Sequence, residues 1–268
     1  LYDLSSDPGE TKNLVAREPE ILDRLRSALG RERLQDRGVK RGAEDAATLE
    51  RLRALGYIAA SAPAEQKDVY TEADDPKNLI DIDTRNRAVV TAFMNGRIDE
   101  AIELAKENLR QRPTMSGANL QLAYLERARG NLNAAIVAAR RAVFLRPLDA
   151  EGLALLGAYL TEAGRAKEAV ALLDPYVKAA ALEYDVVTAL GLARAALGQA
   201  PQAREAFETA RRLDPSNAMG LVNLGTLSLM SGDRNGARAS LNEALALNPS
   251  TAKAHNTLGV MAAQEGRL

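Results

Sequence analysis

From about residue 82 onward, apolar residues follow the spacing of amphipathic helices. Leu153, Leu156 and Leu160 recur at intervals of three and four residues before Gly164, so they share one face of a helix. The stretch 201–213 shows the same spacing after another glycine. The pattern therefore predicts pairs of helices, with a glycine between the two helices of each pair.

Three residue types repeat with one period of 34 residues. Glycine recurs at Gly96, Gly130, Gly164, Gly198, Gly232 and Gly266, and alanine follows five residues later at Ala101, Ala135, Ala169, Ala203 and Ala237. Proline recurs at Pro113, Pro147, Pro215 and Pro249, with Ala181 in the remaining position. Glycine ends the first helix because it adopts the left-handed conformation at low cost, alanine lets two helices cross closely, and proline stops the second helix.

This pattern resembles the tetratricopeptide repeat (TPR) family, whose consensus is Trp-x2-Leu-Gly-x2-Tyr, then Ala-x3-Phe, then Pro. Here Val187-x2-Leu190-Gly191 matches the first part and Ala203-x3-Phe207 matches the second. The resemblance implies an all-α fold, a solenoid in which helical hairpins form a right-handed superhelix. The repeats expected from it cover residues 82–115, 116–149, 150–183, 184–217 and 218–251, with a half repeat at 252–268.

Several positions depart from the consensus. The chain has no Trp. In the first repeat the Trp position holds Arg85, which suggests a degenerate unit. In the third to sixth repeats the same position holds Leu153, Val187, Leu221 and His255. We expect His255 to pack against the neighbouring helix. Pro175 lies inside a second helix and is expected to kink or shorten it. Because the pattern stops within the sixth repeat at Leu268, we expect further repeats or a partner chain to cover that end.

Residues 1–81 do not share the period. Residues 1–4 alternate as a short strand does, and residues 5–10 have the composition of a turn. Helices are expected at about 18–34 and 43–55, followed by a linker at 59–81. The first of these helices carries apolar residues on one face, at Ile21, Leu22, Leu25, Leu29 and Leu34.

The N-terminal segment also resembles a known family. Its motif Leu-Tyr-Asp-Leu-x-x-Asp-Pro-x-Glu-x-x-Asn-Leu, from Leu1 to Leu14, is similar to the closing stretch of sulfatases of the alkaline phosphatase superfamily. Residues 49–57 resemble the tail of bacterial sulfatase-like proteins that continue into TPR repeats. The resemblance implies that residues 1–58 are the C-terminal tail of such a domain.

Those enzymes hydrolyse sulfate esters with a formylglycine made from Cys or Ser and with a divalent metal. This chain has no Cys-x-Pro-x-Arg motif, so a catalytic domain, if the parent protein has one, is expected upstream of Leu1. The resemblance further implies a periplasmic or secreted location.

The composition narrows the possible chemistry of the chain. There is no Cys, which excludes thiolate metal sites and Cys nucleophiles, and a single His is too few for most zinc sites. The net charge of −1 gives no general attraction to nucleic acid. No apolar run is long enough to span a bilayer, so no membrane insertion is expected. We predict no catalytic residue, no metal site and no cofactor in this chain.

Two charged clusters have a simpler interpretation than a binding site. Asp74-Asp75 and Asp81-x-Asp83 lack the Gly and distal Glu of a calcium-binding loop, so we interpret them as linker and helix-cap carboxylates. The basic residues of the region 31–41 are diluted by Glu32 and Asp36 and have no interleaved aromatic residue. We therefore interpret that region as a solvated loop, not as a nucleic-acid site.

The concave groove formed by the first helices is the predicted binding site, by analogy with TPR proteins that bind peptides there. Its expected residues are Asn86, Val90, Phe93, Gln121, Tyr124, Ala158, Thr188, Leu192, Asn223, Thr226 and Asn256. Only Asn223 and Lys253 match the family's carboxylate clamp, so we expect a helical or extended peptide or protein segment with few charges. Self-association, a spacer role and an accessory role beside a sulfatase-like hydrolase are the alternatives.

Overall fold

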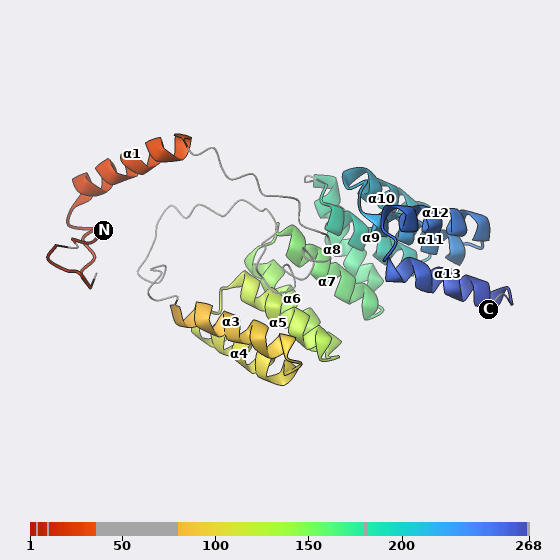
Figure 1. Cartoon of the computed structure of the whole chain (residues 1–268), viewed down its shortest axis with the longest axis horizontal. Helices are drawn as coiled ribbons and strands as arrows, with labels where there is room; N and C mark the ends of the chain where they lie inside the picture. Colours follow the sequence, from red (N-terminus) through yellow and green to blue (C-terminus); the bar gives the residue numbers. More distant parts are fainter. Residues whose placement is uncertain (4, 10, 36–79, 180–181, 267–268) are drawn as a thin grey trace. The chain divides into compact units, whose positions relative to one another are not determined.

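The computed structural model describes residues 1–3, 5–9, 11–35, 80–179 and 182–266, and it divides the chain into two compact units, Leu1–Ala46 and Ala47–Leu268 (Figure 1). Within those residues the secondary structure consists of helices joined by turns, with no strand. The all-α prediction is thus confirmed. The helix expected at 43–55 and the linker up to residue 79 lie outside the described residues.

In the first unit, hydrogen-bonded turns precede one helix. The Asp3 carboxylate accepts hydrogen bonds from the hydroxyls of Ser5 (2.5 Å) and Ser6 (2.7 Å). These bonds, with that of Ser5 the largest contribution, lower the pKa of Asp3 to about 2. The strand expected at residues 1–4 is wrong for the described residues 1–3, because local side-chain bonds close a turn there.

The helix of this unit, α1 (Pro19–Gln35), matches the expected range within one residue. Its apolar face has no cover among the described residues, since Ile21, Leu25 and Leu29 are all exposed.

The second unit is a row of helical hairpins. Its helices are α3 (Ile80–Met94), α4 (Ile98–Gln111), α5 (Ser116–Ala128), α6 (Leu132–Leu145), α7 (Ala150–Glu162), α8 (Ala166–Ala179), α9 (Tyr184–Ala196), α10 (Ala200–Leu213), α11 (Ala218–Met230), α12 (Arg234–Leu247) and α13 (Ala252–Gln264). From α5 onward the first helix of each hairpin begins 34 residues after the previous one. Figure 1 shows successive hairpins side by side along the chain.

Each hairpin turns at a periodic glycine. All six of these glycines have φ between 67° and 90°, the left-handed region that glycine enters without a Cβ penalty. At Gly130 the amide donates to the carbonyl of Arg127 (3.0 Å), and the next amide, of Asn131, donates to Glu126 (2.8 Å). These bonds satisfy carbonyls that the end of α5 leaves free.

Within a hairpin, the sizes of the two residues that face each other across the helix pair are matched. A Cβ added to Gly191 of α9 would lie 2.5 Å from the Phe207 ring of α10, and one added to Gly157 of α7 would lie 2.5 Å from Leu173 of α8. In the second hairpin, α5 and α6, alanines occupy both equivalent positions, Ala123 and Ala139, and both are fully buried. A large side chain on one helix is therefore matched by a glycine on the other.

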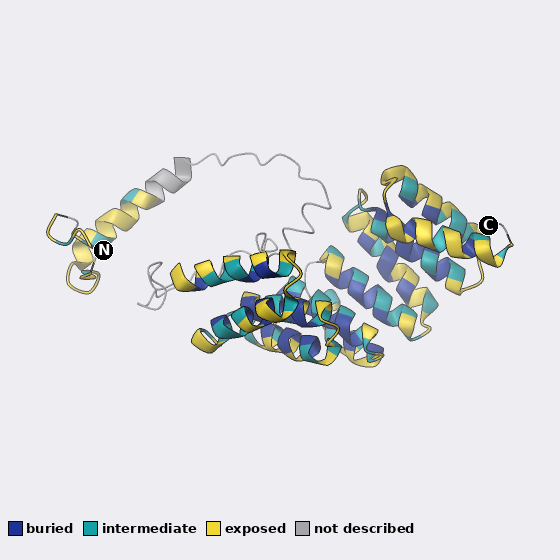
Figure 2. Cartoon of the chain, turned by 60° about the horizontal axis from the view of Figure 1, so that its bottom comes forward, coloured by how far each residue is buried: buried dark blue, intermediate teal, exposed yellow. Residues whose placement is uncertain are grey.

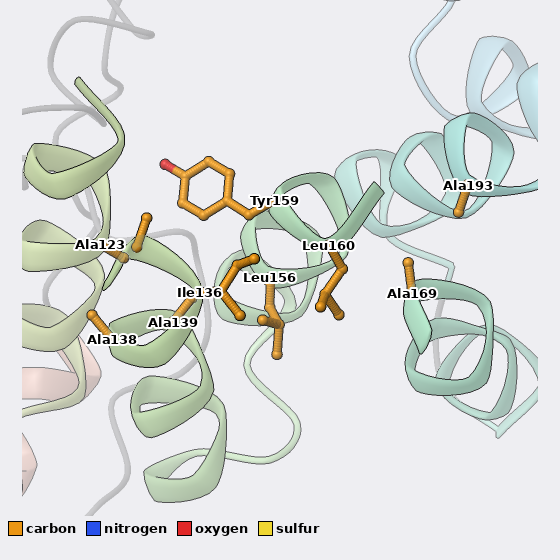
Figure 3. Packing of buried hydrophobic residues seen from close by; sticks show 10 residues of the cluster. Ala123, Ile136, Ala138, Ala139, Leu156, Tyr159, Leu160, Ala169 and Ala193 are labelled. Carbon is orange, nitrogen blue, oxygen red and sulfur yellow. The ribbon is translucent and has the colours of Figure 1, made fainter. Parts of the chain in front are cut away.

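The core runs between the hairpins (Figure 2). One buried cluster joins helices from α5 to α9, and Figure 3 shows its members converging from several of them. The cluster consists of Ala123, Ala135, Ile136, Ala138, Ala139, Leu156, Tyr159, Leu160, Ala169 and Ala193. Because small residues outnumber large ones, the helices pack closely, and each hairpin depends on its neighbours for burial.

Two expectations for single residues need correction. Pro175 does not shorten α8, which has 14 residues like α4, α6, α10 and α12, while the kink expected at this proline stays a prediction. Packing of Leu173, Tyr176 and Val177 in one core cluster offsets the hydrogen bond that Pro175 removes. His255 is exposed, and its Nε2 lies 2.8 Å from the carbonyl oxygen of Pro249. Unlike the buried Val187 at the equivalent position, it belongs to α13, which no second helix follows among the described residues.

Candidate protein-binding face

A row of equivalent residues runs along the first helices. Val90, Tyr124, Ala158, Leu192 and Thr226 are spaced by 34 residues and occupy the same position on α3, α5, α7, α9 and α11. Tyr124 is exposed and the other four are half-buried. We call this row, with its flanking residues on the same helices, the first-helix face. Val260 extends the row onto α13 and is exposed. The row presents apolar and small side chains that the array itself does not cover.

An aromatic pair marks the N-terminal end of this face. The rings of Phe93 on α3 and Tyr124 on α5 have centroids 6.1 Å apart at an interplanar angle of 74°, an edge-to-face contact. Met94, beside Phe93, is exposed. The pair places a rigid, partly exposed apolar surface across the boundary between the first two hairpins.

Beyond the aromatic pair, an ion pair and a buried phenol border the face. Arg127 of α5 binds Glu162 of α7 at 2.5 Å, and the hydrogen bond to Glu162 raises the pKa of Arg127. Tyr159 on α7 is buried, and burial raises its pKa to about 12. The pKa values of Arg127 and Tyr159 both lie well above neutral pH, so neither of these two side chains changes its charge there.

The predicted amides are engaged inside the array. Asn86 accepts a hydrogen bond from the Asn108 side-chain amide (2.7 Å), and Asn108 also accepts from Arg85 (2.8 Å). Asn223 is buried and accepts from the Lys253 ammonium at 3.3 Å. Desolvation lowers the pKa of Lys253. The two residues that match the carboxylate clamp are thus brought together, with their polar ends directed at each other.

The remaining predicted residues differ in exposure. Gln121 and Thr188 are half-buried and Asn256 is exposed. The hydroxyls of Thr188 and of Tyr184, one helical turn earlier on α9, are both shielded from solvent. Thr188 therefore contributes mainly its methyl group to any surface contact.

Sequence reasoning missed Asn108, a fully buried amide on α4. It occupies the position that holds alanine in α6, α10 and α12, at Ala142, Ala210 and Ala244. With Arg85 in the Trp position, it replaces the apolar contact of the third to fifth repeats by a hydrogen-bonded one. The sequence did contain a signal for Asn108, because it is an amide at a position where three other repeats have alanine.

The described residues contain no group of three or more His, Asp or Glu side chains placed to hold a metal ion. None of their helices is both long and apolar enough to cross a bilayer.

The comparisons with known proteins agree with this architecture. The family model described as tetratricopeptide repeat matches residues 188–233 and 229–268. No curated protein matches the chain. Residues 188–268 are therefore identified as TPR repeats by sequence.

Solved structures extend the likeness to the rest of the array. A TPR protein from Parabacteroides merdae has a TM-score of 0.65 at 14% identity, covering 72% of this chain and 75% of its own. A thermophilic TPR protein from Thermus thermophilus has a TM-score of 0.57 at 21% identity, covering 66% and 97%. MamA from Desulfovibrio magneticus has a TM-score of 0.53 at 22% identity, covering 63% and 96%. At these identities the likeness establishes the fold, a TPR solenoid.

Proposed function

We propose that the array is a protein-interaction scaffold that binds a helical or extended segment of few charges on the first-helix face, and that this chain carries no catalysis. The observation behind the proposal is the row from Val90 to Thr226, which keeps apolar or small side chains partly exposed on five successive first helices. A repeated surface of this kind suits a segment that contacts several repeats at once.

The engaged amides favour a partner of low charge. Asn86 and Asn223 already have partners within the array, so binding a strongly charged segment through them would break existing hydrogen bonds. Apolar contacts to Tyr124 and Leu192 require no such exchange. The aromatic pair at Phe93 is the expected anchor, because partly exposed aromatic side chains supply most of the binding energy at many interfaces.

The test uses two variants with one matched control. Tyr124→Asp and Leu192→Asp each place a carboxylate in the row, whereas Leu213→Asp makes the same change at an exposed leucine at the end of second helix α10. Partners are identified by crosslinking and mass spectrometry in cells that produce the protein. Their affinities for the purified variants are then measured by fluorescence anisotropy.

We expect both face variants to weaken binding by about tenfold or more, on the order of the loss of one interface anchor, and the control to leave it unchanged. Equal effects of all three substitutions, or no effect of the face variants, contradict the proposal. A crosslink only to a second copy of the chain points to self-association, and no crosslink at all points to a spacer role.

A second candidate function concerns the N-terminal unit. Ile21, Leu25 and Leu29 expose one apolar face of α1, and exposed apolar surfaces of this kind mark interaction sites. With the resemblance of residues 1–14 to sulfatases, we propose as the second candidate that residues 1–58 are the tail of a sulfatase-like hydrolase, exported to the periplasm or secreted, with the TPR array as its accessory region. The expected finding is a Cys-x-Pro-x-Arg motif encoded upstream of Leu1 and no turnover of sulfate esters by the isolated chain. Turnover by the isolated chain would contradict this assignment.

A further inference from the structure

An exposed apolar stripe lies on the second helix α6. Val137 is 68% exposed and Phe144 is 72% exposed, and Leu148, three residues after the helix ends, is 79% exposed. Val137, Arg141 and Phe144 follow each other at intervals of four and three residues, which places them on one face of α6. This face belongs to a second helix and contains none of the residues of the first-helix face.

The repeat architecture does not require apolar residues at these positions. The equivalents of Val137 and Phe144 are Glu103 and Arg110 in α4, and Glu205 and Arg212 in α10. On α8 the equivalents of Val137 and Arg141 are the exposed Ala171 and Pro175, and the equivalent of Phe144 is the exposed Lys178. On α12 the equivalents of Val137 and Phe144 are the small residues Ala239 and Ala246. Among the described second helices, α6 thus carries the large apolar side chains at these two positions, which indicates a role beyond folding.

An ion pair joins α6 and α8 beside this stripe. Arg140 of α6 reaches Glu168 of α8 at 2.7 Å, and Arg165 binds the same carboxylate at 2.6 Å. Residues at equivalent positions of successive second helices belong to the same face of the array, so the stripe on α6 and the exposed Ala171 and Pro175 of α8 share one face. We call it the α6–α8 patch, defined by Val137, Arg141, Phe144, Leu148, Ala171 and Pro175.

The patch carries an excess of positive charge. The Arg141 guanidinium lies 5.2 Å from the centroid of the Phe144 ring, and it has no carboxylate partner among the described residues. Glu168 is shared by two arginines, and Asp174 is shared by Lys178 and Arg194. A carboxylate brought to this surface would therefore find cations that the array leaves only partly compensated.

We propose that the α6–α8 patch binds an amphipathic helix of another protein, whose apolar residues cover Val137 and Phe144 and whose carboxylate pairs with Arg141. A helix fits because the exposed side chains lie in one line along α6, the arrangement that residues at i, i+3, i+4 and i+7 of a partner helix would match. The patch acts independently of the first-helix face, so one array can hold two partners.

A second copy of the chain fits the patch less well than an acidic helix. In a two-fold symmetric contact each surface meets itself, and Arg141 lies near the middle of the stripe from Val137 to Leu148. The two guanidinium groups would then face each other in a partly desolvated interface, where like charges repel most strongly. An acidic segment replaces that repulsion by attraction.

The test measures binding of two synthetic helical probes to the full chain by fluorescence anisotropy. The first probe has leucines at i, i+3, i+4 and i+7 flanked by glutamates, and the second has lysines in place of the glutamates. We expect the acidic probe to bind about tenfold or more tightly than the basic one. Phe144→Asp should weaken that binding by about tenfold or more, and Arg141→Glu should remove the preference for the acidic probe.

Tyr124→Asp is the control, since it alters the first-helix face and leaves the patch intact. An unchanged affinity of the acidic probe for this variant is expected. Loss of binding in Tyr124→Asp but not in Phe144→Asp would overturn the patch and still leave the first-helix face as a binding site. Equal binding of both probes, binding of neither, or a dimer of the chain that Phe144→Asp dissociates would also overturn the proposal. Circular dichroism shows whether each variant remains folded.

Discussion

The close approach of Gly191 to Phe207 can be tested by adding a single methyl group. In Gly191→Ala the new Cβ would lie 2.5 Å from Cε1 and 2.7 Å from Cδ1 of the Phe207 ring, far inside normal contact. The ring is only 1% exposed and has no open space to enter. Overpacking of a buried site costs about 1–3 kcal/mol, and with two ring carbons in conflict the upper end applies.

Helix propensity acts in the opposite direction. Replacing glycine by alanine inside a helix stabilises it by about 1 kcal/mol. The net expectation for Gly191→Ala is therefore a loss of about 2 kcal/mol in the free energy of unfolding. Gly259 occupies the equivalent position on α13, where an added Cβ meets no atom within 4 Å. Gly259→Ala should therefore gain in helix propensity without a steric conflict, and it should stabilise α13 by about 1 kcal/mol.

Urea denaturation followed by circular dichroism gives the stability of each variant. Hydrogen exchange resolved by helix shows whether the change falls on α9 and α10 or on α13. Phe207→Leu, measured with and without Gly191→Ala, supplies a double-mutant cycle, and the two changes should be coupled by more than about 0.5 kcal/mol. Stabilisation by Gly191→Ala equal to that by Gly259→Ala would refute the close packing of α9 on α10.

Three further predictions follow from the packing. Ala139→Leu should destabilise the second hairpin by about 1–3 kcal/mol, and adding Ala123→Gly should restore much of that stability. The midpoints of urea denaturation measure both changes, and no restoration would contradict the matching of a large side chain with a glycine. Pro175→Ala should raise stability by about 1–3 kcal/mol if it restores a helical hydrogen bond, and a lowered thermal midpoint would contradict this. Asp174 accepts hydrogen bonds from Lys178 and Arg194, and that from Lys178 contributes most to lowering its pKa below 3.8. Its stabilising effect is present above about pH 4 and is lost as the pH falls through the lowered value. Asp174→Asn should therefore cost up to about 1 kcal/mol at about pH 7 and progressively less below about pH 4, by urea denaturation across that range; an equal loss at every pH would refute it.

The periodic features of the fold could be predicted from the sequence because they are local. Gly130 and its equivalents end a helix wherever they occur in this pattern, since only glycine adopts their backbone conformation cheaply. The spacing of Leu153, Leu156 and Leu160 likewise requires a helix with one apolar face. Such signals depend on neighbours within a few residues, so no tertiary information was needed.

The tertiary structure alone decided which side chains remain available for binding. Asn86 and Asn223 were expected in the groove, yet Asn108 and Lys253, 22 and 30 residues away, hydrogen-bond them. The exposure of Phe144 depends on which helices lie beside α6. Exposure and hydrogen bonding are settled by residues distant in sequence, whereas the 34-residue period is settled by the backbone preferences of each hairpin itself.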